Sequence, residues 1–119
     1  MAEEGRKGLK MTVEAFVNAI GFKTVCMPSH EKEIDGVYIG DLLSWVMGNA
    51  NSGNLWITIM SNINIVAVAT LVDAACIVLA EGVNPDPDAL SAAEAKGINI
   101  ISTPLSAYEA AVAVSNLIK

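Results

Sequence analysis

Basic residues and histidine are scarce in this chain of 119 residues. Lys and Arg total 7 against 13 Asp and Glu, which gives a formal net charge of −6. A nucleic-acid-binding surface normally carries a basic stripe, whereas the only basic cluster here lies at positions 6–10 beside Glu3 and Glu4, so we expect no nucleic-acid partner. His30 is the single histidine and has no cysteine nearby. It cannot complete a zinc site, so we expect a surface loop residue there and no metal site.

The common catalytic and nucleotide-binding motifs are missing too. The chain has no Gly-x-x-x-x-Gly-Lys-Ser/Thr loop, no Gly-x-Gly-x-x-Gly turn and no Gly-x-Ser-x-Gly elbow. Asp35 and Asp41 could pair as carboxylates, but a surface position for Asp35 and a helix cap for Asp41 are commoner roles. We therefore predict a protein that is not an enzyme, without a cofactor.

Cysteines are few, and no apolar run is long enough to cross a membrane. Cys26 and Cys76 lie far apart in apolar, strand-like stretches, which favours buried thiols in a reducing compartment. A membrane span needs about 20 nearly uninterrupted apolar residues. The longest apolar region, 57–80, is broken by Ser61, Asn62, Asn64 and Asp73. The N-terminus also lacks the apolar segment of a secretion signal. These features predict a cytoplasmic protein without a membrane partner.

Hydrophobic residues, in contrast, are abundant. They make up 53% of the chain, and charged residues only 17%, which excludes a disordered protein. We predict a flexible leader at 1–10 and one domain over 11–119. This composition leaves more apolar surface than a small monomer easily hides, so self-association is expected.

Strand-like and helix-like segments alternate along the chain. Strands are predicted at 22–27, 34–39, 55–60, 76–80 and 98–101. Helices are predicted to follow Thr12, Asp41, Ser61 or Asn62, Asp86 and Ser106, each of which can cap free N–H groups. Gly21 and Gly97 are placed to end two of them, and Ser106 and Glu109 form a capping box. This order predicts an α/β fold, a mostly parallel sheet with helices on both faces.

The block from Asn54 to Asp73 is the most distinctive part of this pattern. It combines an uninterrupted apolar strand with a helix that has almost no polar side. Such a helix must be covered on more than one side. We expect the sheet on one side and a second subunit on the other, which predicts a homodimer. Trp45 and Trp56 are both expected in the core.

Ligands of open parallel sheets bind where strands end and helices begin. The chain places small polar loops at those points, and free N–H groups of helix N-termini favour anions. The alternative, that these loops are ordinary caps and turns, stays open. The candidate ligand-binding residues are Asp41, Thr58, Asn62, Asn64, Glu81, Gly82, Thr103, Ser106 and Tyr108.

Several short stretches resemble the DRTGG domain. They are Val37-Tyr-Ile-Gly-Asp-Leu-Leu43, Leu55-Trp-Ile-Thr-Ile59, Asn64-Ile-Val-Ala-Val68, 77–85 and Ile101-Ser-Thr-Pro-Leu-Ser-Ala-Tyr-Glu109. This resemblance implies a free-standing member of a family that also occurs inside phosphotransacetylases and in pyrophosphatases with CBS domains. A related fold forms the N-terminal domain of HPr kinase/phosphorylase. In none of these does the resemblance imply that this domain performs the chemistry.

One loop departs from the family pattern. Where relatives typically carry Thr-Gly-Gly, this chain has Ala80-Glu81-Gly82. The change removes a hydroxyl and a glycine and adds a carboxylate, which would repel a phosphate bound at this loop.

The leading hypothesis is a non-catalytic regulatory module that senses a ligand and acts as a homodimer. The ligand would be small and anionic or nucleotide-like. The first alternative is a protein-interaction adaptor with a protein partner and no small ligand. The second is a small enzyme that uses Asp41, Glu81 or Tyr108.

Overall fold

The computed structural model describes residues 10–118 and contains one five-stranded sheet. Its strand order is β1-β5-β4-β3-β2; β1 runs antiparallel to β5, and all other neighbours are parallel. The strands are β1 (Lys23–Cys26), β2 (Val37–Ile39), β3 (Leu55–Thr58), β4 (Cys76–Leu79) and β5 (Ile100–Ser102). The predicted leader at 1–9 lies outside the described residues, whereas Lys10 forms an ion pair with Asp35 at 3.2 Å.

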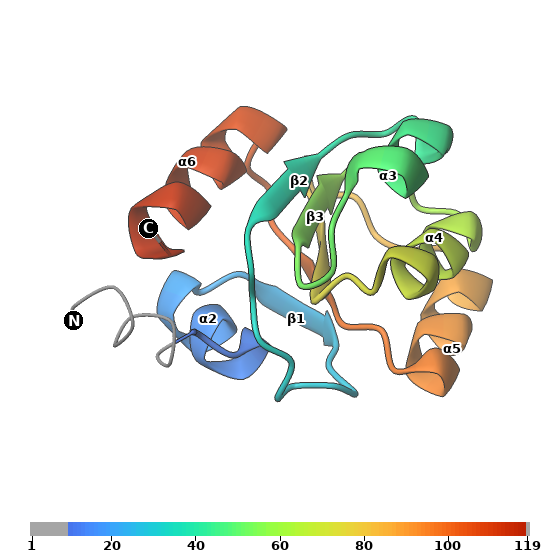
Figure 1. The fold of residues 1–119 in the computed structure, drawn as a ribbon, viewed down its shortest axis with the longest axis horizontal. Helices are drawn as coiled ribbons and strands as arrows, with labels where there is room; N and C mark the ends of the chain where they lie inside the picture. The colour runs from blue at the N-terminus through green and yellow to red at the C-terminus, as the bar shows by residue number, and fades with distance from the viewer. Residues whose placement is uncertain (1–9, 119) are drawn as a thin grey trace.

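Helices cover both faces of this sheet, which confirms the predicted α/β architecture (Figure 1). Each connection from β2 to β5 leads to the neighbouring strand in one direction, so right-handed crossovers place their helices on one face. These helices are α3 (Leu43–Asn49), α4 (Asn64–Val72) and α5 (Pro87–Lys96). The opposite face is covered by α2 (Val13–Ile20) and α6 (Ala107–Ile118).

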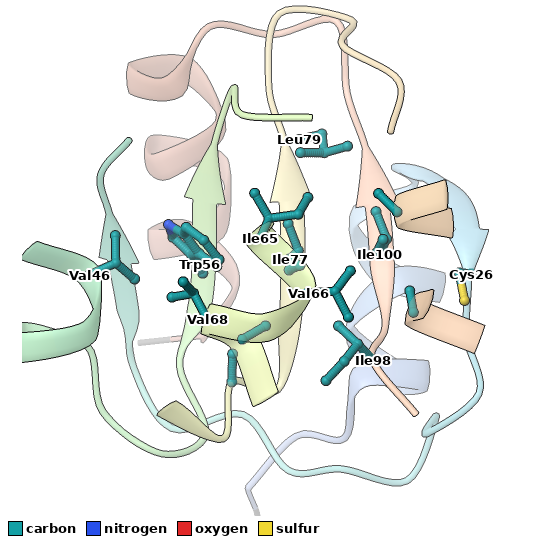
Figure 2. Packing of buried hydrophobic residues seen from close by; sticks show 14 residues of the cluster. Cys26, Val46, Trp56, Ile65, Val66, Val68, Ile77, Leu79, Ile98 and Ile100 are labelled. Atoms are coloured by element: carbon teal, nitrogen blue, oxygen red, sulfur yellow. The ribbon is translucent and has the colours of Figure 1, made fainter. Parts of the chain in front are cut away.

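Each face of the sheet has its own hydrophobic core. Trp56, Ile77 and Ile100 pack beneath α3, α4 and α5 (Figure 2). Leu55 and Val78 pack on the other face, beneath α2 and α6. Because neighbouring residues of a strand point to opposite faces, β3 and β4 are buried at every position. Cys26 and Cys76 are buried free thiols, as predicted.

The predicted caps at Thr12 and Ser106 and the glycine ends at Gly21 and Gly97 are confirmed, whereas Ile63, not Ser61 or Asn62, is the N-cap of α4, and Asp86 holds its N-cap position without a side-chain hydrogen bond. The Thr12 hydroxyl accepts a hydrogen bond from the Ala15 N–H at 3.2 Å, and Gly21 ends α2 in the left-handed region at φ 79°. In the capping box, the Glu109 N–H donates to the Ser106 hydroxyl at 3.1 Å and the Ser106 N–H donates to the Glu109 carboxylate at 3.0 Å. Local sequence alone therefore determines where these helices begin and end.

The predicted cap at Asp41 is wrong. Leu42 holds the N-cap position of α3 and makes no side-chain cap hydrogen bond. The Asp41 carboxylate instead accepts hydrogen bonds from the end of β3, which lies beside β2 in the sheet. Asp41 therefore bonds to a neighbouring strand of the sheet instead of to the N–H groups of the helix that follows it.

Two further predictions need correction. Trp45 was expected in the core, but it lies 62% exposed on α3, whereas Trp56 is fully buried. The strand predicted at 34–39 is only three residues long. Gly36 has φ 90°, which interrupts the extended backbone just before β2.

Most of helix α4 is buried within a single subunit. Val66 and Val68 are only 1% and 5% exposed, and α4 packs between α3 and α5 on the sheet. Its outer side still exposes Ile63 and Leu71, at 42% and 69%. The apolar sequence of α4 is therefore explained on three sides within one subunit, and a partner subunit is left to the outer side as a prediction.

Candidate functional site

The strand-end loops lie along one edge of the sheet, because β2, β3, β4 and β5 are parallel. We call this the carboxyl edge. Asp41, Thr58, Glu81, Gly82 and Thr103 lie at the last residues of these four strands or within three residues after them. The geometry thus brings together candidate residues that are far apart in the sequence.

Asp41 and Thr58 are in direct contact. The Thr58 hydroxyl donates to Asp41 Oδ1 at 2.7 Å, and the Ile59 N–H donates to the same oxygen at 3.0 Å. Thr58 is 2% exposed, and its hydroxyl also accepts from the Met60 N–H at 3.2 Å. This network joins the ends of β2 and β3 and uses the Asp41 oxygen as a structural acceptor.

The backbone donors of the Glu81-Gly82 loop are already used. The Glu81 N–H donates to the Leu105 carbonyl at 2.8 Å, and the Gly82 N–H donates to the Thr103 carbonyl at 2.9 Å. Glu81 lies in the left-handed region at φ 61°, next to Gly82 at φ 72°. The loop is therefore held against the β5–α6 connection, and its N–H groups are not free to bind an anion.

Asn62 and Asn64 form the turn that starts α4. Asn62 Oδ1 accepts a hydrogen bond from the Asn64 N–H at 2.9 Å. The Ser61 carbonyl accepts from the Asp86 N–H at 2.9 Å, which ties this turn to the start of α5. These contacts account for both asparagines as turn residues.

Ser106 and Tyr108 are set apart from the other candidates by their places at the start of α6, directly before it and in its first turn. Ser106 is occupied by the capping box described above, and Tyr108 is 77% exposed. Tyr38, the other tyrosine, packs against the core beneath α3.

A hollow of about 430 Å³ opens at the carboxyl edge where β5 meets β1. It combines two predicted residues, Gly82 and Thr103, with residues at the start of β1 that sequence reasoning missed. Its lining consists of Gly21, Phe22, Lys23, Gly82, Asn84, Ser102, Thr103 and Pro104. Lys23 pairs with Ser102 across the antiparallel β1–β5 ladder, which places its strand end beside that of β5. Nothing in the local sequence around Lys23 signals this partner.

Among residues 10–118, Lys23 is the only charged residue that lines this hollow. It is exposed and makes no ion pair with any residue in the range 10–118. Phe22 is half-buried, and Glu81 is not part of the lining. The hollow therefore offers an ammonium group and an amide, beside the half-buried Phe22 ring and the largely buried Ser102 and Thr103 side chains. These groups suit binding of a small anion, and they include no nucleophile paired with a base.

Neither a metal centre nor a membrane span is found in the part of the chain that is described. No three His, Cys, Asp or Glu side chains between residues 10 and 118 gather as metal ligands would. Within the same residues, every helix is too short or too polar to cross a bilayer.

A second notable surface lies on the outer sides of α3 and α4. The run from Leu42 to Val72 contains no Asp, Glu, Lys, Arg or His, although both helices face outward. It exposes Leu42, Trp45, Ile63 and Leu71, which we call the α3–α4 face. Depletion of charge together with exposed aromatic residues is typical of protein contact surfaces.

Comparison with solved structures and with family models relates the chain to known proteins. The regulatory region of Clostridium perfringens pyrophosphatase, with its CBS and DRTGG domains in complex with the activator diadenosine tetraphosphate, has a similar fold, with a TM-score of 0.72 at 14% identity. The match covers 87% of this chain and 45% of that one, so this chain spans about half the length of its solved relative. A search of curated proteins found no match. The sequence model of the DRTGG domain matches residues 16–117, and the chain therefore belongs to the DRTGG domain family.

Proposed function

We propose that this chain is a non-catalytic regulatory module that senses a small ligand and works as a homodimer in the cytoplasm. The observation that carries the ligand part is the hollow at the carboxyl edge, where Lys23 stands without an ion-pair partner from residues 10–118 beside Phe22 and Thr103. Family membership supports the regulatory part, since a DRTGG domain belongs to the regulatory region of the clostridial pyrophosphatase. The buried free thiols fit a reducing compartment.

The ligand class that fits the hollow is a small anion of nucleotide type. The Lys23 ammonium supplies charge, and an ammonium and a phosphate about 4 Å apart attract by roughly 4 kcal/mol at an effective dielectric near 20. The Phe22 ring offers an apolar face. Because Glu81 does not line the hollow, its charge opposes the ligand only from outside. That the solved relative binds diadenosine tetraphosphate supports a nucleotide as the first ligand to test.

Calorimetric titration with a panel of adenine nucleotides tests this site. We expect binding by the natural chain and an affinity about tenfold lower for Lys23→Gln, a loss of roughly 1.4 kcal/mol. Lys96→Gln is the matched control, because Lys96 is also exposed and ends α5 away from the hollow. Equal affinities of the two variants would place the ligand elsewhere.

The homodimer is tested by size-exclusion chromatography with light scattering at micromolar concentration. We expect a mass twice that of one chain, because large apolar side chains such as Ile39, Trp45 and Leu71 lie exposed, and exposed apolar patches often mark contact sites. A single-chain mass up to the highest soluble concentration would refute the dimer. It would leave the ligand site untouched.

The α3–α4 face favours a second candidate function, a protein-interaction adaptor without a small ligand. Trp45 is its largest side chain, and exposed tryptophans often dominate contact energies. A broad thermal-shift screen separates the two functions, because a ligand of the native state raises the melting temperature. No shift with any ligand, together with loss of a protein complex in Trp45→Ser, would favour the adaptor.

A further inference from the structure

Strand β2 forms one edge of the sheet, and no strand within residues 10–118 pairs with its outer side. Toward β3, the Gly40 N–H donates to the Ile57 carbonyl at 3.2 Å, and the Leu55 N–H donates to the Gly36 carbonyl at 3.0 Å. Successive residues of a strand turn their backbone groups to opposite sides. The N–H and C=O groups of Val37 and Ile39 therefore point outward. Figure 1 shows β2 in front of the other strands, with no helix drawn across it.

The surface beside this strand is apolar and uncharged. Val37 and Ile39 are 37% and 48% exposed, and they border a cavity of about 500 Å³ between β2 and α6. Helix α6 contributes two further exposed residues, Tyr108 and Val112. We call the whole the β2–α6 surface; it is mostly apolar and consists of Val37, Tyr38, Ile39, Tyr108, Ala111, Val112, Ser115 and Ile118. An apolar edge strand left open is a template for uncontrolled pairing, so folded proteins normally cover or charge such edges.

We propose that a second copy of this chain covers the β2 edge by antiparallel pairing. Val37 then lies opposite Ile39 of the partner subunit, and Tyr38 lies on the two-fold axis. The two sheets join into one continuous sheet of ten strands. This inference rests on the homodimer proposed above and gives that homodimer its interface, at β2 instead of at the outer side of α4, where the sequence predicted the second subunit.

The register is what favours a second copy over another partner. In an antiparallel pair, two directly opposed residues exchange both of their hydrogen bonds. Pairing Val37 with Ile39 in both directions makes four hydrogen bonds and uses every outward backbone group of these two residues. A two-fold interface must be self-complementary, and a short strand centred on Tyr38 meets that condition. The same rotation brings the two α6 helices toward each other across the β2–α6 surface.

Charge is compatible with this arrangement. Each chain carries a net charge of −6, so a self-interface must avoid unpaired carboxylates. Asp35 and Asp41 flank β2, and both are already engaged. Asp35 pairs with Lys10 at 3.2 Å, and Asp41 accepts from Thr58 and Ile59 on the β3 side. The pairing segment from Gly36 to Gly40 contains no charge.

A pair of matched charge substitutions tests the location. Ile39→Lys and Leu71→Lys each place one ammonium on an exposed apolar side chain, the first on the β2–α6 surface and the second on the α3–α4 face. We expect Ile39→Lys to raise the dimer dissociation constant at least tenfold and Leu71→Lys to leave it unchanged. Circular dichroism and thermal melting must show both variants folded. If Ile39→Lys does not fold, Val37→Lys takes its place.

Cysteine crosslinking provides an independent reading of the register. Directly opposed residues of an antiparallel pair that share no hydrogen bonds have Cα atoms about 4.5 Å apart, which suits a disulfide. Tyr38→Cys should therefore form a disulfide-linked dimer under mild oxidation. Trp45→Cys, on α3, is the control and should stay unlinked. The natural Cys26 and Cys76 are buried, so they contribute little background.

The outcomes separate this inference from the homodimer itself. Dissociation by Ile39→Lys with crosslinking through Tyr38→Cys supports the β2 interface. A dimer that Leu71→Lys or Trp45→Cys identifies at the α3–α4 face overturns the β2 interface and leaves the homodimer standing. If the natural chain is monomeric at all concentrations, both the β2 interface and the homodimer are overturned. The same holds if a monomeric chain binds only a foreign extended peptide at β2.

Discussion

The two ends of the parallel strands are built differently. At the amino edge, buried amides precede the strands: Asn54 directly before β3 and Asn99 directly before β5, at 6% and 1% exposure. Both bind backbone groups of distant segments. At the carboxyl edge, Asp41 and Thr58 make a side-chain contact, backbone hydrogen bonds join the loops, and the hollow opens beside Lys23. The buried amides of the amino edge therefore mainly stabilise the fold, whereas the hollow leaves polar groups at the carboxyl edge accessible.

The largest expected effect lies at the amino edge, in Asn99→Ala. The Asn99 amide accepts from the Ser29 N–H at 2.9 Å and donates to the Ser29 and Ala75 carbonyls at 2.8 and 2.9 Å. Truncation leaves three backbone groups without these partners, so the free energy of unfolding should fall by about 3 kcal/mol. Urea unfolding measures it. Asn18→Ala, an exposed asparagine on α2, should change stability by no more than about 0.5 kcal/mol.

The carboxyl-edge counterpart is Thr58→Val, with a smaller expected effect. It removes the hydroxyl that donates to Asp41 at 2.7 Å while keeping the side-chain volume. Loss of this hydrogen bond to a carboxylate, and of the acceptor for the Met60 N–H, should lower stability by about 2 kcal/mol. Thr24→Val, on the exposed edge strand β1, is the control and should be nearly neutral. An unchanged stability in Thr58→Val would show that the Asp41 contact does not hold the two strand ends together.

The carboxyl edge also contains a site where substitution should stabilise the protein. Glu81 has φ 61°, a conformation that costs a residue with a Cβ roughly 1–2 kcal/mol. Glu81→Gly removes this cost but makes the unfolded chain more flexible by about 0.4–1 kcal/mol. The melting temperature should rise slightly, by the equivalent of about 0.5–1 kcal/mol. Glu81→Ala keeps the strain and removes only the charge, so a gain in Glu81→Ala as well would assign the effect to the carboxylate instead.

Prediction from sequence succeeded where the signals are local. Neighbouring residues were enough to predict the alternation of strands and helices along the chain. They also predicted the glycine ends of α2 and α5 and the Ser106–Glu109 capping box. It failed where a distant segment supplies the partner. The Asp41 carboxylate accepts its hydrogen bonds from the end of β3 instead of from α3. Lys23 lies at the hollow because β1 pairs with β5. Trp45 was misplaced because hydrophobicity alone does not distinguish a core side chain from an exposed contact residue.

Candidate residues could be placed at strand ends because the alternation of strands and helices, and with it a mostly parallel sheet, was predictable from the sequence. The sequence did not predict which of these residues share a hollow. The hollow depends on the antiparallel edge strand β1, and no local pattern indicates that β1 pairs with β5. Gly82 and Thr103 line the hollow with Lys23, whereas Ser106 and Tyr108 do not. Whether the hollow binds a ligand is the proposal that the Lys23→Gln titration decides.

The smallest expected effect returns to the amino edge and depends on pH. Hydrogen bonds from Lys32 at 2.8 Å and Ser52 at 2.6 Å lower the pKa of Asp73 below its ordinary value of 3.8. Because the folded pKa is lowered, this stabilisation is fully present above pH 3.8 and is lost as the pH falls through the lower folded pKa. The Asp73 side chain is 64% exposed, so solvent screening should limit the effect to a few tenths of a kcal/mol. A carboxyl NMR titration is the sensitive measurement: in Lys32→Gln the pKa of Asp73 should rise toward its ordinary value. An unchanged pKa in that variant would show that the ion pair seen here does not persist in solution and that the amino edge relies on its buried amides alone.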